Sequence, residues 1–171
     1  MGTRSGDLDP GMLLALMRAE GLLVDETEEL LSRGSGFLGL TGSSDLREIE
    51  ARAAAGDDAA QLAIHVFAHR LRKYIGAYAA VMGGIDAVVF TGGIGEHSAL
   101  VRCRVLARLE FLGALLNEDL NRNVWVDRGH RVATISGPQA RVQLLVVATD
   151  EELAMVQEAA ALLYRGAGRE A

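Results

Sequence analysis

The sequence contains little cysteine, little proline and no long apolar run. Its one cysteine, Cys103, excludes an internal disulfide framework and any metal site built from cysteines alone. No apolar stretch approaches the roughly 20 residues that span a bilayer. The first residues also lack the charged segment and the apolar segment that together mark a secretory signal. We therefore expect a cytoplasmic protein that does not enter a membrane.

Basic residues are outnumbered, with 17 Lys and Arg against 23 Asp and Glu and a net charge of −6. A surface that binds nucleic acid needs clustered Lys and Arg to neutralise phosphates, so we expect no nucleic-acid partner. Half of the 171 residues are hydrophobic, and the mean hydropathy is +0.18. That apolar content is enough for a sizeable core in a chain of single-domain length.

Glycine is abundant and clustered, with 20 in the chain. Several punctuate the first quarter, and Gly92, Gly93 and Gly95 lie together near the middle. Such clusters mark turns or places of close backbone approach. Between them we expect helices from helical spacing of apolar residues and from capping residues. Their expected places are Pro10 onward, Val24–Leu31, Ser44 or Asp45 to about Ala55, about Asp57 to Gly83, Ser98 to about Leu112, and Asp150–Leu163.

Short apolar runs predict strands at Asp86–Phe90 and Val142–Ala148, both buried on their two faces. A third strand is expected at Arg131–Ser136. Strands that alternate with helices indicate an α/β layer architecture. Three strands make a thin sheet, because sheets commonly have about four to six. Either further strands escape the pattern or the chain lacks them.

The turn expected between Phe90 and Ser98 is the most informative local motif. Glycines after a strand let a ligand lie against the backbone, and a following helix N-terminus favours anions. The segment has no lysine, so it is not a Walker A loop, and Ser98 stands where the dinucleotide motif needs Gly or Ala. The alternative is an ordinary tight turn between strand and helix.

Four further segments each allow a functional and a structural interpretation. Arg4 could present a guanidinium to a phosphoryl group, or begin a disordered start. Residues 43–47 could contact a ribose or purine, or cap a helix. Thr149–Glu152 could place Glu151 near Mg²⁺, while Thr149 and Glu152 have the spacing of a capping box. His65 and His69 lie four residues apart, but no third metal ligand accompanies them.

Taken together, five segments resemble acetate kinase, in order along nearly the whole chain. They are MGTRSGDLDP at 1–10, SSDLR at 43–47, HRLRKYIGAY at 69–78, DAVVFTGGIGE at 86–96 and TDEEL at 149–153. The wider group is the sugar kinase, Hsp70 and actin-like superfamily, with a ribonuclease H-like fold. The resemblance implies that residues 1–165 form an incomplete C-terminal nucleotide-binding domain, helix-rich with a thin sheet. It further implies a frayed tail at 166–171 and an absent N-terminal domain.

The same resemblance implies reversible transfer of the ATP γ-phosphoryl group to acetate, giving acetyl phosphate and ADP, with Mg²⁺ as cofactor. A homodimer formed through the C-terminal domain is also implied. By position, Arg4 matches the arginine that stabilises the phosphoryl transition state, and Glu151 matches the magnesium-binding glutamate. The positions that match nucleotide-binding residues are Asp45, Leu46, Arg47, Gly93, Ile94, Gly95, Glu96 and His97.

Two features depart from the family pattern. His97 stands where the family loop usually has Asn, and a histidine ring lacks the paired donor and acceptor of an amide. Family members are also more than twice this length, and this chain begins at what would be their middle. We therefore expect catalysis to require the absent half. The alternative is a non-catalytic nucleotide-binding or assembly module derived from the family.

Overall fold

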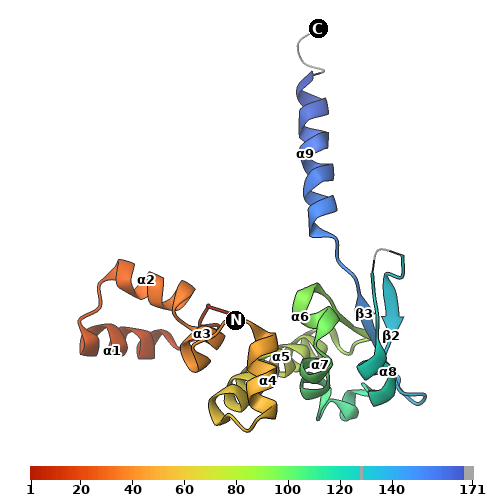
Figure 1. The fold of residues 1–171 in the computed structure, drawn as a ribbon, viewed down its shortest axis with the longest axis horizontal. Helices are drawn as coiled ribbons and strands as arrows, with labels where there is room; N and C mark the ends of the chain where they lie inside the picture. Colours follow the sequence, from red (N-terminus) through yellow and green to blue (C-terminus); the bar gives the residue numbers. More distant parts are fainter. Residues whose placement is uncertain (128, 168–171) are drawn as a thin grey trace. The chain divides into compact units, whose positions relative to one another are not determined.

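The computed structural model describes residues 1–127 and 129–167, without the side chains of residues 151–152 and 163–167. The chain forms two compact units, Met1–Tyr78 and Ala79–Ala171. Helices make up the first unit, and the sheet belongs to the second (Figure 1). The helices of the first unit are α1 (Pro10–Glu20), α2 (Val24–Arg33), α3 (Gly36–Thr41), α4 (Leu46–Ala54) and most of α5 (Asp58–Met82).

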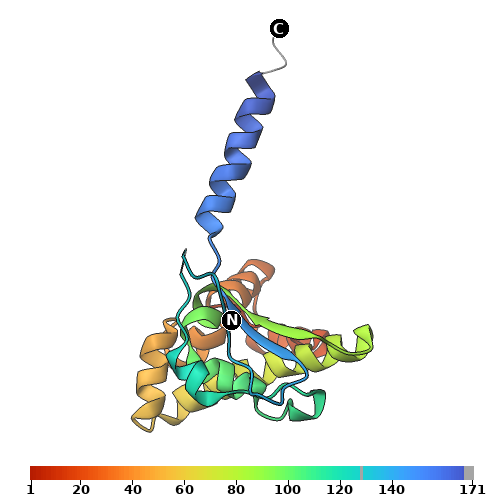
Figure 2. The ribbon, with the colours of Figure 1, turned by 90° about the vertical axis from the view of Figure 1, so that its right-hand side faces the viewer.

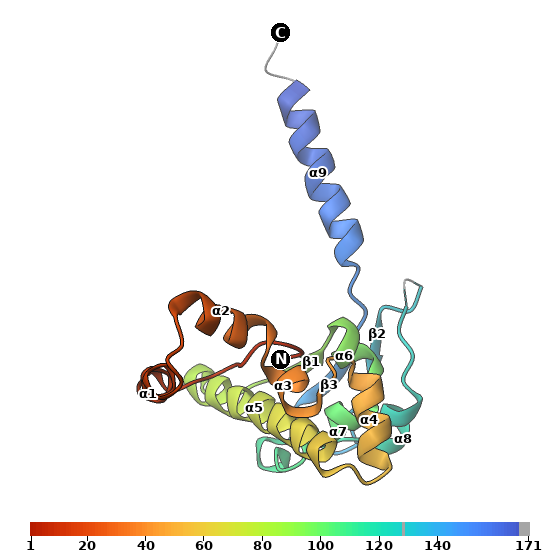
Figure 3. The same cartoon turned by 60° about the vertical axis from the view of Figure 1, so that its left-hand side comes forward.

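Capping residues begin two of these helices where the sequence predicts. Asp9 caps α1, because its Oδ1 accepts from the Met12 amide at 2.8 Å, and Pro10 follows at the first helical position. Asp45, rather than Ser44, caps α4. Helix α3 was not predicted, since it is six residues long and lies between glycines. Helix α3 lies beside α5 (Figure 3), and its buried Phe37 contacts Phe67 of α5 with ring centroids 5.1 Å apart.

Helical spacing of apolar residues predicts one stripe along this segment, from Ala60 and Ile64 to Tyr78 and Val81, and the long helix α5 buries only the start of that stripe. Ala60 and Ile64 are buried as expected. Tyr78 and Val81, at the end of the predicted stripe, are 58% and 85% exposed. Apolar residues beside the stripe, such as Leu62, predict that more than one face of the helix is covered. Leu62 is exposed, so this prediction was wrong at that position. The apolar stripe predicted the helix correctly, but the described residues bury only part of the stripe.

The second unit contains a three-stranded sheet in the order β1-β3-β2 (Figure 3). Its strands are β1 (Ala87–Phe90), β2 (Val132–Thr134) and β3 (Gln143–Val147). Strand β3 pairs parallel with β1 and antiparallel with β2. All three lie within the predicted ranges, so a thin α/β sheet is confirmed.

The prediction that β1 and β3 are buried on both faces was wrong. Leu144 and Val146 of β3 are fully buried, whereas Leu145 between them is half-buried and Gln143 before them is exposed. In β1, Phe90 is buried and Val89 is 51% exposed. Successive side chains of a strand point to opposite faces of the sheet. The described chain therefore covers one face of this sheet and leaves the other open.

The second unit also contains the short helices α6 (Gly92–His97), α7 (Ala99–Leu106), η1 (Glu110–Leu112, a 3₁₀ helix) and α8 (Glu118–Asn123), and the 17-residue helix α9 (Glu151–Ala167). Ser98 caps α7 as predicted, with its Oγ accepting from the Val101 amide at 3.0 Å. The expected helix to Leu112 ends earlier, and Gly113 ends η1 instead. Helix α8 was not predicted. None of the helices in the described part of the chain is both long and apolar enough to span a membrane.

Candidate functional site

The carboxyl ends of β1 and β3 lie at the same edge of the sheet, because the two strands are parallel neighbours. Strand β1 continues through Thr91 into α6, and β3 continues into α9 (Figure 2). The Thr91 hydroxyl donates to the Val147 carbonyl at 2.9 Å. In α/β sheets, ligands bind outside the carboxyl ends of the strands. This edge thus brings together two of the predicted segments, Gly93–His97 and the start of α9.

Glu96 joins these two segments directly. Its Oε1 accepts from the Thr149 amide at 3.0 Å, the Thr149 hydroxyl at 2.8 Å and the Gly92 amide at 2.9 Å. Burial alone would raise the pKa of Glu96, but these hydrogen bonds, led by those from Thr149, hold it below its usual value. Glu96 is therefore a carboxylate that fixes α6 to the end of β3.

The spacing of Thr149 and Glu152 allowed a capping box, in which the Thr149 hydroxyl would accept from the backbone of α9. This interpretation was wrong for the Thr149 hydroxyl. That hydroxyl donates to Glu96, 53 residues away in sequence. Asp150 caps α9 instead, with its Oδ1 accepting from the Leu153 amide at 3.1 Å. The side chains of Glu151 and Glu152 lie outside the described residues. Glu151 itself is the first residue of α9, beside the Thr149–Glu96 contact.

The sequence predicts a turn at Thr91–Gly95, whereas the chain forms the six-residue helix α6. Two of its glycines have local causes. Gly92 has φ +70°, and a Cβ at Gly95 would lie 3.1 Å from the Phe90 carbonyl carbon. Gly93 has neither cause, since it is exposed and a Cβ there would meet nothing within 4 Å. The described fold leaves the surface over Gly93 open to a ligand.

The remaining predicted residues of α6 lie near its end. Ile94 is half-buried, and its carbonyl accepts from the Ser98 amide at 3.0 Å. His97 is the last residue of the helix and is exposed. Sequence reasoning missed Arg102 of α7, whose buried guanidinium donates to the carbonyls of Gly95 and Glu96 at 2.8 and 2.9 Å. An arginine inside an apolar helix face was the available signal.

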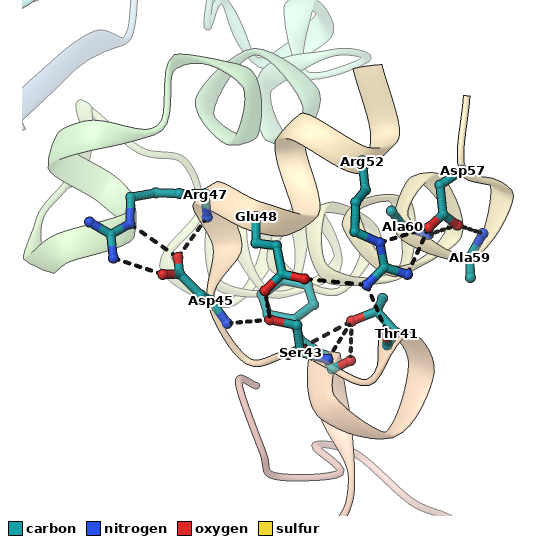
Figure 4. Close-up of polar contacts among 10 residues, drawn as sticks. Thr41, Ser43, Asp45, Arg47, Glu48, Arg52, Asp57, Ala59 and Ala60 are labelled. Atoms are coloured by element: carbon teal, nitrogen blue, oxygen red, sulfur yellow. Dashed lines mark hydrogen bonds and ion pairs between the residues drawn. The ribbon is translucent and has the colours of Figure 1, made fainter. Parts of the chain in front are cut away.

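In the first unit, Asp45 and Arg47 lie at the start of α4 (Figure 4), and Leu46 is the first residue of that helix. Asp45 accepts two bonds from the Arg47 guanidinium, Nε to Oδ1 at 3.1 Å and Nη2 to Oδ2 at 2.7 Å. The side-chain hydrogen bond from Arg47 lowers the pKa of Asp45 to about 2. The Arg47 side chain is 91% exposed, and Leu46 is half-buried. Asp45 thus both caps α4 and holds Arg47.

Side chains of α4 also fix the loop that leads into it (Figure 4). Arg52 donates to the Thr41 carbonyl at 2.8 Å, and the Ser43 hydroxyl donates to Glu48 at 2.7 Å. The Asp45 amide donates to that same Ser43 oxygen at 3.2 Å. This arrangement fixes the backbone from which Asp45 and Arg47 project.

The segment around Arg4 is ordered by backbone pairing, so the disordered-start alternative was wrong. The Ser5 amide donates to Leu31 and the Ser35 amide donates to Thr3, each at 2.9 Å. Gly36, with φ +62°, passes so close to the Met1 carbonyl that a Cβ would clash with it. Arg4 itself is exposed. Within the part of the chain that the structure describes, its guanidinium has no hydrogen bond or ion pair.

Asp7, three residues after Arg4, is held by three side chains of α5. It accepts from Arg70 Nη2 and Lys73 Nζ at 2.7 Å each and from the Tyr74 hydroxyl at 2.6 Å. The hydrogen bond from Lys73, followed by that from Tyr74, lowers the pKa of Asp7 to about 2. Gly6 before it has φ +83°, and a Cβ there would clash with the Arg70 guanidinium. We call these four polar residues the Asp7 clamp.

No group of three or more His, Cys, Asp or Glu side chains that could hold a metal ion occurs among the described residues. His65 and His69 therefore have no third ligand there, and the interpretation of this pair as a metal site has no support. A single carboxylate is a common protein ligand of Mg²⁺, because water and phosphate oxygens complete its octahedron. The start of α9 remains compatible with such a site.

The chain matches known proteins over most of its length. The model of the acetokinase family matches residues 1–157. An acetate kinase of Clavibacter michiganensis is 50% identical over 161 residues, which are 94% of this chain and 40% of that protein. An acetate kinase of Carboxydothermus hydrogenoformans is 48% identical over 158 residues, 92% of this chain and 38% of the relative. The chain thus spans about two fifths of the length of these relatives.

Solved structures agree with the sequence matches. The acetate kinase of Porphyromonas gingivalis superposes with a TM-score of 0.85 at 44% identity, covering 95% of this chain and 40% of that one. A propionate kinase of Francisella tularensis gives a TM-score of 0.82 at 37% identity, covering 92% and 39%. The predicted fold class is confirmed, because the chain is a helix-rich α/β fold with a thin sheet and matches part of an acetate kinase structure. Because the family model matches residues 1–157, the chain belongs to the acetokinase family.

Proposed function

We propose that this chain carries the nucleotide-binding part of a cytoplasmic acetate kinase, which reversibly transfers the ATP γ-phosphoryl group to acetate and yields acetyl phosphate and ADP. The observation that carries this proposal is the joined sheet edge. There Glu96 of α6 bonds to Thr149, two residues before the proposed metal ligand Glu151. A glycine-rich helix start beside a carboxylate is an arrangement suited to a nucleotide and its magnesium.

Each proposed role follows from the chemistry of its side chain or backbone. The backbone of Gly93–His97 contacts the adenosine, with open space over Gly93. Asp45, Leu46 and Arg47 would also contact the nucleotide. Arg4 supplies positive charge to the transferring phosphoryl group, since such a transfer needs positioned charge more than covalent chemistry. Glu151 would hold Mg²⁺, which neutralises phosphate charge when bound.

Catalysis in this proposal requires the length of the family that the chain does not span. Short carboxylates other than acetate are alternative acceptors, because one similar structure is called a propionate kinase. The alternative is a non-catalytic module. Such a module would bind nucleotide but show no turnover, even when joined to the part of an acetate kinase that this chain does not span.

The test of nucleotide binding is thermal unfolding of the chain with and without Mg-ADP. At a nucleotide concentration of 100 times its dissociation constant, binding should stabilise the folded chain by about 2.7 kcal/mol. We expect a cooperative transition whose midpoint rises with nucleotide. A cooperative transition that ADP leaves unmoved would overturn the proposed function.

Gly93→Ala should separate nucleotide binding from stability. Alanine favours a helix over glycine by up to about 1 kcal/mol, and the open space over Gly93 accepts the methyl group. The unliganded midpoint should therefore stay equal or rise slightly. The methyl group would fill the surface proposed for adenosine, so we expect about tenfold weaker Mg-ADP binding by calorimetric titration.

The matched control for this substitution is Gly76→Ala. Gly76 lies within α5, and a Cβ there would also meet nothing within 4 Å. This variant should gain similar stability and keep the wild-type affinity for Mg-ADP. Equal affinity in the Gly93→Ala variant would contradict the proposed contact at α6.

We also propose that the chain pairs with a second copy, as the family resemblance implies. Helix α1 has no buried residue, although Met12 and Leu14 on it are apolar and more than half exposed. Exposed apolar patches of this kind mark contact surfaces. Sedimentation should give twice the chain mass, and Leu14→Glu should give the monomer mass. Leu62→Glu, at an exposed position of α5, should leave the mass doubled, and a monomeric wild type would contradict the pairing.

A further inference from the structure

Arg102 is a buried arginine on a helix face that otherwise packs in the core. Its residue is 1% exposed, and its neighbours Val101 and Val105 on α7 are 1% and 0% exposed. Burying a guanidinium is costly unless its donors are satisfied. Its Nη1 donates to two carbonyls of α6, Gly95 at 2.8 Å and Glu96 at 2.9 Å. The polar end of this side chain is therefore directed at the end of the glycine-rich helix.

The carbonyls that Arg102 binds would otherwise lack helical partners. The last four carbonyls of a helix accept no bond within it, and the C-terminus carries partial negative charge. Helix α6 is only six residues long and contains three glycines, so its intrinsic stability is low. A fixed cation that bonds two of these carbonyls stabilises the helical path of Gly93–His97.

Asn121 of α8 fixes the other side of the guanidinium. Arg102 Nε donates to Asn121 Oδ1 at 2.7 Å, and Nη2 donates to the Asn121 carbonyl at 2.9 Å. The Asn121 amide nitrogen donates in turn to the Ala99 carbonyl of α7 at 2.9 Å, and Asn121 is 3% exposed. The bonds from Nε and Nη2 to α8 fix the plane of the guanidinium, and this plane directs Nη1 toward the carbonyls of α6.

We propose that Arg102, oriented by Asn121, is the positioning residue of the nucleotide-binding helix α6. This inference rests on the proposed function, because it assigns to Arg102 the orientation of the backbone that would contact adenosine. A cation alone does not perform this role, since the planar fork makes parallel bonds to α6 and α8 that an ammonium group lacks. Arg102 touches no ligand in this account and acts through Gly95 and Glu96.

Arg102→Lys is the main test, with Arg104→Lys as its matched control on the same helix, because Arg104 is exposed. Two readouts are compared at a temperature where circular dichroism shows each variant folded. The first is amide hydrogen exchange of the unliganded chain at Glu96, His97 and Ser98, against Leu144–Val146 of β3. The second is the dissociation constant of Mg-ADP.

For Arg102→Lys we expect exchange about tenfold faster at Glu96–Ser98 with β3 unchanged, and Mg-ADP binding about tenfold weaker. Arg104→Lys should change neither. If Arg102→Lys does not fold, Asn121→Ser replaces it, since it removes the Nε partner and keeps the arginine. The same local exchange and weaker binding are then expected.

Two results overturn the inference. One is exchange that rises equally in α6 and β3, and the other is unchanged Mg-ADP affinity despite local loosening of α6. Failure of the proposed function is a different result, because then the wild-type chain itself does not bind Mg-ADP. In that case the hydrogen-exchange comparison still decides whether Arg102 holds α6.

Discussion

Arg4→Ala should lower phosphoryl transfer by about 10³-fold or more and leave the stability of the chain unchanged. The guanidinium is exposed, with no hydrogen bond or ion pair among the described residues, so its removal breaks no such bond in the folded chain. A transferring phosphoryl group spreads negative charge over its oxygens, and a positioned arginine stabilises that charge most in the transition state. An effect on rate without one on stability is the expected signature of such a residue.

Turnover is best measured in a fusion, because the chain spans 40% of the Clavibacter michiganensis relative. The part of that acetate kinase preceding the matched region is joined to this chain, and acetyl phosphate formation is followed. Arg18→Ala is the control, since Arg18 is an exposed arginine in the last turn of α1. It should keep wild-type turnover. An Arg4→Ala fusion within tenfold of the wild-type rate would remove Arg4 from the reaction.

Local signals in the sequence predicted the local structure well. Asp9 and Asp45 cap the helices expected of them, and Ser98 begins α7. A cap depends on residues within one turn of itself, so the necessary information lies within a few positions. The three strands were found for a similar reason, because short apolar runs are local as well.

Contacts between distant segments were not predictable in this way. No residue close to Glu96 in the sequence indicates that its carboxylate bonds to Thr149. Without knowledge of that contact, the sequence of α6 predicts a turn. Nor does the sequence around Arg102 show that the carbonyls of α6 and Asn121 enclose its side chain. The prediction that both faces of the sheet are buried was also wrong, as the exposed Val89 shows. An apolar side chain indicates that burial is favourable, but it does not show that another element is present to bury it. Local patterns left a functional and a structural interpretation open for each candidate segment, and the family resemblance chose the functional one.

Asp7→Asn should lower turnover of the same fusion by about tenfold to a hundredfold, although Asp7 would touch no substrate. The Asp7 clamp fixes the chain three residues after Arg4 to Arg70, Lys73 and Tyr74 of α5. An asparagine keeps the shape of the side chain but loses the charge that attracts Arg70 and Lys73. Small displacements of a catalytic group cost up to about 10²-fold in rate.

The clamp also predicts how the chain responds to acid. Asp7 has a pKa of about 2 in the folded chain, and an unfolded aspartate has a pKa of about 3.9. Because the folded value is lower, the contribution of Asp7 to stability is fully present above about pH 4 and declines as pH falls toward 2. Wild-type and Asp7→Asn chains should therefore differ in urea midpoint at neutral pH and converge in acid. Glu28→Gln, at an exposed position after the first turn of α2, should match the wild type throughout.

A double-mutant cycle separates positioning of Arg4 from a general loss of folding. If Asp7 acts on the reaction only through Arg4, then Asp7→Asn should slow the wild-type fusion but produce no further slowing once Arg4 is alanine. A loss of folding would instead lower turnover by the same factor in both backgrounds. Equal factors would therefore contradict the positioning role, and a factor near one in the Arg4→Ala background would establish that the clamp on α5 serves the charge at Arg4.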